Sequence, residues 1–159
     1  MSIRSVAKAM ILNESKVLLN KCYDEYNGAY YSLPGGGQNT YETLHEAVIR
    51  ECLEETGYHV SPKKFVALFE EICEDVEVRK IYPEYAHKIY HIFLCELARD
   101  TVESPTEIDT MQVGIEWVPV EDLHKIHLLP NVLNENIIKL IRDQIPMFLG
   151  SEHVQHGHG

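Results

Sequence analysis

Three glutamates fall at helical spacing in the segment YETLHEAVIRECLEETG, residues 41–57. Each residue of an α-helix is turned by about 100° from the one before it, so Glu51, Glu54 and Glu55 would lie within one arc. The same arc contains three apolar residues, Leu44, Ala47 and Val48. Like charges at these spacings destabilise a helix unless cations screen them, and unpaired charge at the edge of a buried surface is unfavourable. A hard cation such as Mg²⁺, which prefers oxygen ligands, would resolve both problems.

The residues on either side of this segment predict where the helix begins and ends. Before it stands Pro34-Gly35-Gly36-Gly37, where one proline and three glycines predict a tight loop without regular structure. Asn39 or Thr40 can cap the helix, because a glutamate follows Asn39 three residues later in a spacing like that of a capping box. We expect the helix to run to about Thr56, with Gly57 closing it.

Glycine, acidic and basic residues recur here in a fixed order. Gly36 is followed after five residues by Glu42, and after seven more by the run Arg50-Glu51-Cys52-Leu53-Glu54-Glu55-Thr56-Gly57-Tyr58. This segment closely resembles the Nudix box, and the chain resembles the Nudix hydrolase (MutT-like) family. All polar and glycine positions of that pattern are present. An isolated glutamate pair would be read as a solvated acidic face, but this combination is too specific for that reading.

Departures from the box are confined to three places. Cys52 and Tyr58 stand where the family usually has aliphatic residues, and both are still largely apolar. Residues 38–41 (QNTY) replace a Glu and a Gly that many relatives carry, so the loop and the substrate edge can differ. The flanks, SLPGG at 32–36 and GIEWVP at 114–119, also look like the family.

The resemblance implies a fold and a set of roles. The fold is α/β, a Nudix-type α/β/α sandwich with a central mixed sheet. Glu51, Glu54 and Glu55 would hold Mg²⁺ or Mn²⁺, and one of them would act as base toward the attacking water. The catalytic residues would be Glu54, Glu51 and Arg50, with Arg50 orienting Glu46 or Glu54, each four residues away. The supporting residues would be Gly36, Gly37, Glu42 and Gly57.

A further metal or base carboxylate often comes, in proteins that look like this, from the loop before the last strand. Four carboxylates are available in that region: Glu103, Glu107, Asp109 and Glu116. Spacing does not decide among them, and loop carboxylates are usually only exposed. We put forward Glu107 and Glu116.

Other elements follow from apolar patterning and turn residues. Strands are expected at 3–12 and 16–22, joined as a hairpin through 13–15, and at 29–33, 65–78, 87–97 and 114–118. Helices are expected at 119–123 and 132–144, and loops at 79–86 and 99–112. We expect one domain over residues 1–150 and a mobile, His-containing tail over 151–159 (SEHVQHGHG), which lacks apolar mass.

Composition limits the partners of the chain. Asp and Glu outnumber Lys and Arg by 25 to 14, and the net charge of -11 disfavours binding to long nucleic acid or to an anionic membrane. A protein that handles phosphates then needs local positive charge, which a bound metal would supply. The four cysteines show no CxxC spacing, and no secretory signal or membrane span is evident, so we expect a cytoplasmic protein. A homodimer is possible by resemblance alone.

Side chains that can contact a substrate are harder to single out. Five tyrosines can stack on a base, although tyrosines in strands and turns more often pack: Tyr30, Tyr31, Tyr82, Tyr85 and Tyr90. Five basic residues can contact phosphate, although lone basic residues are usually surface charges: Arg4, Lys8, Lys21, Arg79 and Lys88. The tail histidines His153, His156 and His158 can bind metal, but a non-catalytic tail is the simpler reading.

The expected function is therefore a metal-dependent pyrophosphohydrolase that cleaves the phosphoanhydride of a nucleoside diphosphate derivative by water attack on phosphorus. The substrate would be a small nucleotide: a nucleoside triphosphate, an oxidised nucleotide, ADP-ribose or a nucleotide sugar. One alternative is a Nudix-like nucleotide-binding sensor module without turnover, whose usual sign would be loss of box carboxylates. Another is an mRNA-cap or dinucleoside-polyphosphate hydrolase, against which the acidity of the chain weighs.

Overall fold

A mixed eight-stranded sheet forms the centre of the protein in the computed structural model, which describes residues 2–107 and 110–156. The strands are β1 (Arg4–Asn13), β2 (Lys16–Asp24), β3 (Gly28–Ser32), β4 (Gly35–Gly37), β5 (Tyr58–Cys73), β6 (His87–Val102), β7 (Gln112–Pro119) and β8 (Met147–Val154). Their order is β3-β2-β1-β6-β5-β8, while β4 pairs with β1 and β7 pairs with β2. The β1–β6 and β5–β8 pairs are parallel, and the other pairs are antiparallel.

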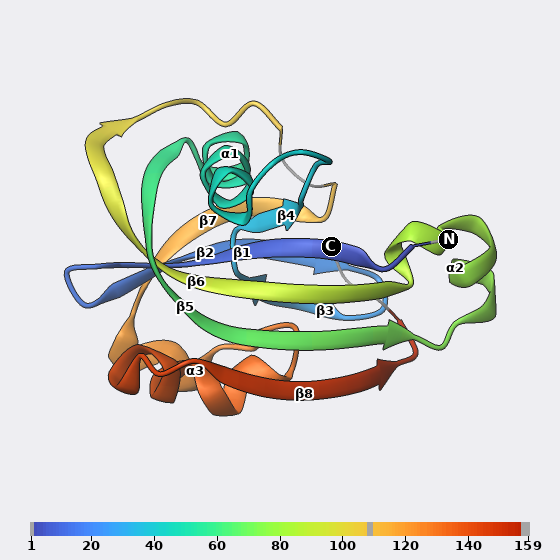
Figure 1. Ribbon diagram of the computed structural model, residues 1–159. Helices are drawn as coiled ribbons and strands as arrows, with labels where there is room; N and C mark the ends of the chain where they lie inside the picture. The colour runs from blue at the N-terminus through green and yellow to red at the C-terminus, as the bar shows by residue number, and fades with distance from the viewer. Residues whose placement is uncertain (1, 108–109, 157–159) are drawn as a thin grey trace.

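Helices cover both faces of this sheet. The α-helices are α1 (Leu44–Thr56), α2 (Val76–Ile81) and α3 (Val132–Asp143), and the 3-10 helices are η1 (Pro83–Tyr85) and η2 (Val120–Lys125). Helix α1 lies on one side of the sheet and α3 on the other, while α2 lies beyond the end of β5 and β6 (Figure 1). The expected α/β sandwich with a central mixed sheet is confirmed.

Alternate residues of the central strands pack against opposite helices. In β1, Ala7, Ala9 and Ile11 belong to the apolar cluster that contains Ala47, Val48 and Cys52 of α1. Met10 belongs to a second cluster that contains residues of α3, among them Leu133 and Ile137. Because side chains alternate along a strand, covering both faces produces the continuously buried run from Val6 to Ile11.

The sheet divides along one edge of β1. Residues Val6–Lys8 of β1 pair with β4, whereas Ile11–Asn13 pair with β2. The segment expected as a loop at 34–37 therefore contains a short strand, and this part of the prediction is wrong. Gly35 has φ +140°, and a Cβ there would lie 2.1 Å from the Ala7 carbonyl oxygen, so close backbone pairing explains this glycine.

Helix α1 begins later than the sequence suggested. Its N-cap is Thr43, whose side chain accepts a hydrogen bond from the Glu46 amide while Glu46 binds back to the Thr43 amide. This capping box displaces Asn39 and Thr40 from the predicted role. The other end is as expected, because Gly57 adopts φ 78° and its amide donates to Leu53.

The segment between β5 and β6 also differs from the prediction. Strand β5 begins at Tyr58 and ends at Cys73, so residues 76–78 are not strand but part of α2. The side chain of Asp75 starts this helix by accepting from the amides of Glu77 and Val78. Strand β6 continues to Val102 and replaces the first part of the loop expected at 99–112. The first hairpin, β7 and α3 agree with the prediction.

The C-terminal segment forms a strand where a tail was expected. Strand β8 runs through the proposed boundary at residue 150 and pairs in parallel with β5 as far as Val154. The backbone of β5 supplies the hydrogen bonds here, which is why low apolar content did not prevent strand formation. Within the described part of the chain, no helix is long and apolar enough to cross a membrane.

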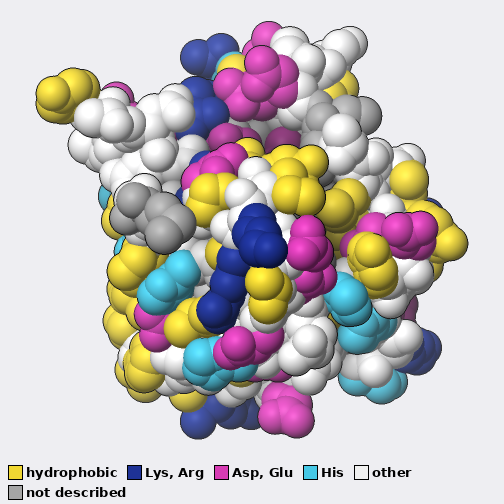
Figure 2. All heavy atoms as spheres, turned by 90° about the vertical axis from the view of Figure 1, so that its right-hand side faces the viewer, with side chains coloured by type: hydrophobic (Ala, Val, Ile, Leu, Met, Phe, Trp, Pro, Cys, Tyr) yellow, Lys and Arg dark blue, Asp and Glu magenta, His cyan; other side chains and the backbone are white. Residues whose placement is uncertain are grey.

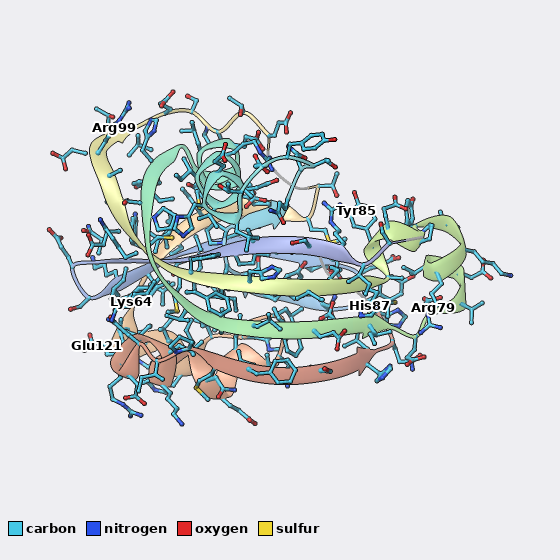
Figure 3. The ribbon with its side chains drawn as sticks, in the orientation of Figure 1. Lys64, Arg79, Tyr85, His87, Arg99 and Glu121 are labelled. Carbon is cyan, nitrogen blue, oxygen red and sulfur yellow. The ribbon has the colours of Figure 1, made fainter. Side chains whose placement is uncertain are left out.

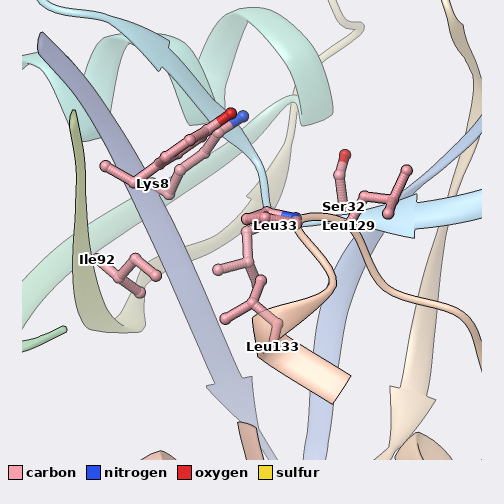
Figure 4. Close-up of a pocket in the computed structure, with 8 residues that line it drawn as sticks. Lys8, Ser32, Leu33, Ile92, Leu129 and Leu133 are labelled. Carbon is pink, nitrogen blue, oxygen red and sulfur yellow. The ribbon is translucent and has the colours of Figure 1, made fainter. Parts of the chain in front are cut away.

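A small void lies where β1 and the β3–β4 connection meet α3. Its volume is about 10 Å³, and Lys8, Leu33 and Leu133 are among the residues around it (Figure 4). This is room for about one water molecule, so a substrate has to bind elsewhere.

Candidate active site

A cleft of about 1150 Å³ extends from α1 to the α2–η1 segment. Its walls come from α1, β4, the first halves of β1 and β6, the β2–β3 turn, the α2–η1 segment and the residues before β7. Figure 2 faces the end of the molecule that carries α2 and shows acidic, basic and histidine side chains close together on this surface. Charges of both signs therefore surround the cleft.

Arg50 organises the acidic end of the cleft. Its guanidinium donates two hydrogen bonds to Glu42, at 2.7 and 2.9 Å, one to Glu51 at 2.9 Å, one to Glu54 at 3.2 Å and one to the Gly37 carbonyl at 2.9 Å. The hydrogen bond from Arg50 lowers the pKa of Glu42 to about 2. Of the two partners left open by spacing, Glu54 is bound, while Glu46 is engaged with Thr43. Glu42 accepts two hydrogen bonds from Arg50, more than any other partner, although the sequence analysis placed it only among the supporting residues.

Glu55 lies deeper than the other carboxylates, with 8% of its surface exposed. One of its oxygens accepts hydrogen bonds from the Gly35 amide at 2.9 Å and from the Asn20 side chain at 3.1 Å. Burial raises the pKa of Glu55 to about 7, although the attraction of Lys8 and these hydrogen bonds oppose the rise. This carboxyl therefore changes charge near neutral pH in the metal-free protein.

The loop that follows β6 closes the end of α1. The amides of Thr106 and Glu107 both donate to the Glu54 carbonyl, at 2.9 and 3.0 Å, so one orphan carbonyl of the helix terminus is satisfied. Gly57 is needed here, because a Cβ would lie 1.7 Å from the Glu103 carbonyl oxygen. The loop brings Glu107 into the lining of the cleft. Burial, followed by repulsion from Glu51, raises the pKa of Glu54, and Glu107 adds to this repulsion.

The other candidates for an additional carboxylate do not share this position. Glu116 accepts a hydrogen bond from Tyr31 at 3.1 Å, and Tyr31 packs against the apolar cluster of α3, on the far side of the sheet from α1. The structure therefore does not bring Glu116 to the box glutamates. Glu103 pairs with His59. Asp109 lies outside the described residues.

The acidic end fits a hard divalent cation by its chemistry. The three box glutamates offer carboxylate oxygens, the ligands that Mg²⁺ and Mn²⁺ prefer. Gly36 leaves room for one of them, since a Cβ at this position would lie 2.7 Å from the Glu51 carboxylate. Within residues 2–107 and 110–156, no three His, Cys, Asp or Glu side chains already converge on one point. Instead, Arg50 Nη1 binds both Glu51 and Glu54.

Basic side chains also line the cleft, along the pair of strands β1 and β6, and this part is the basic end. Arg4, Lys8 and Lys88 line it, as three of the five basic candidates. Lys8 Nζ donates to the Gly35 carbonyl at 3.1 Å, and Lys88 Nζ lies 3.9 Å from the Glu71 carboxylate. The remaining two candidates, Lys21 and Arg79, pair with Glu116 and Glu74 and do not line the cleft.

Aromatic side chains stand beside this basic end. Of the five tyrosines considered, Tyr82, Tyr85 and Tyr90 line the cleft, whereas Tyr30 and Tyr31 do not. Figure 3 shows Tyr85 at the same end of the sheet as Arg79 and His87, and far from Lys64, Arg99 and Glu121 at the other end.

Two further cleft residues come from distant parts of the chain. Tyr26, which the sequence analysis missed, stacks on His156 with ring centroids 4.2 Å apart. His156 also lies 3.7 Å from Asp75, and His153 pairs with Glu74. The tail histidines that the structure describes thus have protein partners, and His158 lies outside the described residues.

Sequence reasoning also missed the residues that hold Glu55. The Gln112 side chain donates to Asn20 at 3.3 Å and to the Glu55 carbonyl at 3.2 Å, and Asn20 in turn donates to the Glu55 carboxylate. These amides stand 35 and 57 residues from Glu55. No local spacing connects them with the box, and only strand pairing brings β2 and β7 beneath α1.

Comparisons with known proteins show the family to which this chain belongs. The NUDIX domain family model matches residues 2–143. The nucleoside triphosphatase NudI of Klebsiella pneumoniae is 32% identical and is matched over 79% of this chain and 88% of the relative. Putative nudix hydrolase 1 of Caenorhabditis elegans is 28% identical over 77% of this chain, which spans only 30% of that relative's length. A NUDIX hydrolase from Nitrosomonas europaea has a similar structure, with a TM-score of 0.68 at 18% identity over 92% of this chain and 94% of that one. This chain belongs to the Nudix hydrolase family.

Proposed function

We propose that this chain is a metal-dependent pyrophosphohydrolase that cleaves the phosphoanhydride of a nucleoside diphosphate derivative by attack of water on phosphorus. One observation carries the proposal: Arg50 holds box carboxylates at one end of a cleft whose other end is basic and aromatic. This arrangement matches a nucleotide, whose phosphate chain needs cations and whose planar base can stack on an aromatic ring.

In this proposal Glu51, Glu54 and Glu55 hold Mg²⁺ or Mn²⁺. When bound, the ion neutralises phosphate oxygens and makes a coordinated water easier to deprotonate. Glu107 is the candidate for an additional carboxylate, because it lines the cleft beside Glu54.

The protein groups contribute position and proton transfer. Arg50 fixes Glu51 and Glu54 through charge-assisted hydrogen bonds, while Asn20 and the Gly35 amide fix Glu55. Glu54 is the proposed base, since it lines the cleft and the hydrogen bond from Arg50 to its Oε2 fixes its position. Arg50 remains charged throughout, because its hydrogen bond with Glu42 raises its pKa further above the usual value.

The substrate in this proposal is a small nucleotide. The relative named as a nucleoside triphosphatase favours a nucleoside triphosphate among the candidates, which also include oxidised nucleotides, ADP-ribose and nucleotide sugars. The cytoplasmic location and the homodimer stay predictions.

The test is a substrate panel with coupled phosphatase detection of released phosphate, in Mg²⁺, Mn²⁺ or EDTA. It should include nucleoside triphosphates, oxidised dGTP, ADP-ribose, nucleotide sugars, diadenosine polyphosphates and capped RNA. We expect metal-dependent turnover of at least one small nucleotide, and a fall in kcat of about 10²–10⁴-fold for Glu54→Gln.

Glu116→Gln is the matched control, because it removes a carboxylate from the other face of the sheet. Turnover that survives EDTA, or that Glu54→Gln leaves intact, would contradict the proposal. If no compound is hydrolysed while nucleotides bind, the chain acts as a sensor instead. If capped RNA or a diadenosine polyphosphate is the preferred substrate, the chain is an mRNA-cap or dinucleoside-polyphosphate hydrolase instead.

A further inference from the structure

Arg4 occupies an unusual position for a cation in so acidic a chain. Its guanidinium lies over the Tyr85 ring, 4.6 Å from the ring centroid, and it lines the cleft. Among the residues that the structure describes, no carboxylate lies within ion-pairing distance of it. Stacking on an aromatic face fixes a guanidinium while leaving its N–H donors available. Arg4 is thus held in place with hydrogen-bonding capacity directed at the cleft.

Gly37 links Arg4 to the acidic end. A Cβ at Gly37 would lie 2.3 Å from Arg4 Nη2, and the nearest atoms all belong to this guanidinium. The Gly37 carbonyl accepts a hydrogen bond from Arg50 Nη2 at 2.9 Å. The two guanidinium groups therefore flank one glycine. Arg50 is engaged by glutamates, whereas Arg4 is not.

Strand register gathers further positive charge around Arg4. Arg4 stands opposite Lys88 in the β1–β6 pair, and Lys88 stands opposite Glu71 in the β5–β6 pair. Lys88 and Glu71 are buried, with 8% and 3% of their surfaces exposed. Burial lowers the pKa of Lys88 against the attraction of Glu71, and Lys8 and Arg4 lower it further by repulsion. An anion bound beside Arg4 would relieve this repulsion.

We propose that Arg4, held by Tyr85 and Gly37, binds a phosphoryl group of the substrate that the box carboxylates do not hold. The residue would thereby favour substrates with a third anionic group, nucleoside triphosphates, over nucleoside diphosphates that end in a neutral sugar. Arg4 is a specificity-determining residue in this inference, which rests on the proposed function. Guanidinium groups suit this task because their N–H donors match phosphate oxygens in pairs.

The first test compares kcat and KM for a nucleoside triphosphate and a nucleotide sugar in wild type, Arg4→Gln and Arg4→Lys. For the triphosphate we expect Arg4→Gln to lower kcat/KM by about 10- to 100-fold, mainly through KM. For the sugar nucleotide the change should stay below about threefold. Arg4→Lys should recover only part of the loss, because an ammonium keeps the charge but not the paired donors. Arg142→Gln, a surface arginine paired with Asp143, is the matched control.

A second variant displaces Arg4 without removing it. Gly37→Ala places a methyl group against the Arg4 guanidinium, and Gly37 has no positive φ that would strain an alanine. We expect this variant to show the same preferential loss on triphosphates. The double variant Arg4→Gln/Gly37→Ala should be no worse than the more damaged single variant. Additive losses would mean that Gly37 acts through something other than Arg4.

A binding measurement separates failure of this inference from failure of the proposed function. Calorimetry in EDTA would measure inorganic tripolyphosphate binding to wild type and Arg4→Gln, with no turnover involved. Metal-dependent hydrolysis combined with equal losses on both substrate types would overturn the role of Arg4 and leave the hydrolase intact. Absence of hydrolysis combined with Arg4-dependent tripolyphosphate binding would overturn the proposed function and leave the anion site. Equal tripolyphosphate affinity of wild type and Arg4→Gln would overturn the anion site at Arg4.

Discussion

At both ends of the cleft, one charged residue lies among several residues of the opposite charge, but the signs at the two ends are reversed. At the acidic end, Arg50 is a cation bonded to Glu42, Glu51 and Glu54. At the basic end, Glu71 is an anion paired with Lys88, close to further cations. In each case a residue of the opposite sign holds like charges together that would otherwise repel one another.

The ends differ in burial, and this separates their roles. The Arg50 side chain is 28% exposed and that of Glu54 24%, whereas Lys88 and Glu71 are almost fully covered. Exposed partners can exchange one contact for another when a ligand arrives. Buried partners cannot do so without a large desolvation penalty, so the Lys88–Glu71 pair stays fixed next to Arg4, which lines the cleft and has no carboxylate partner among the described residues. The acidic end is thus suited to binding an ion and the basic end to orienting an anion.

Removing the opposite charge should therefore have its largest effect on stability at the basic end. We expect Glu71→Gln to lower the free energy of unfolding by about 3–5 kcal/mol, because Lys88 would remain buried without its carboxylate. Urea denaturation followed by circular dichroism measures this. The double variant Glu71→Leu/Lys88→Met should recover most of the loss, since it removes both charges together. A Glu71→Gln protein as stable as wild type would show that the basic end tolerates its charge unaided.

At the acidic end, the corresponding change should act mainly on activity. Arg50→Lys keeps the positive charge but cannot reproduce the fork that reaches Glu42, Glu51 and Glu54. We expect kcat to fall about 100-fold, because misplaced catalytic groups lose rate steeply. Steady-state kinetics on the best panel substrate would measure it, with Arg142→Lys as control. Equal activity of the two variants would mean that Arg50 does not position the carboxylates.

The same difference explains what could be predicted from the sequence. The acidic end comes from one helix and the loop before it, so the spacing of Glu51, Glu54 and Glu55 was enough to find it. The start of α1 was missed because two similar pairs compete. The Asn39 amide does bond to Glu42, but Thr43 and Glu46 form the complete capping box.

The basic end could not be assembled in advance, although its residues were noted singly. Arg4, Glu71 and Lys88 meet only through the register of β1, β6 and β5. The spacing of residues within one strand does not show which residue of the neighbouring strand lies opposite, so this cluster could not be found from local patterns. The strand β8 was missed for a related reason, since its second half, from Ser151 to Val154, has little apolar content and is held by pairing with β5.

Glu55 belongs to the acidic end but interacts with Lys8 of the basic end: burial raises its pKa, and the Lys8 charge lowers it. Its pKa is raised from 4.5 to about 7 in the folded protein, so the folded state binds its proton more tightly than the unfolded state does. In EDTA, stability should therefore decrease as pH rises from about 4.5 to about 7 and then level off.

Glu55→Gln should remove this dependence. We expect it to stabilise the metal-free protein by about 2 kcal/mol at pH 8 and by little at pH 5. Urea denaturation at both pH values, with Glu121→Gln as control, would measure this. A stabilisation that is equal at both values would assign the effect to packing instead of charge.

The smallest expected effect concerns the carboxylates outside the box. Glu107 lines the cleft and interacts with Glu54, whereas Glu116 binds Tyr31 on the other face of the sheet. We expect Glu107→Gln to lower kcat about tenfold, a loss of about 1.4 kcal/mol in transition-state stabilisation, and Glu116→Gln to change it less than twofold. In a titration of activity against Mg²⁺, Glu107→Gln should need a higher Mg²⁺ concentration for half-maximal activity, whereas Glu116→Gln should need the same concentration as wild type. A larger loss of kcat for Glu116→Gln than for Glu107→Gln would contradict this assignment. It would mean that a carboxylate on the far face of the sheet affects catalysis, although buried apolar residues separate the two faces.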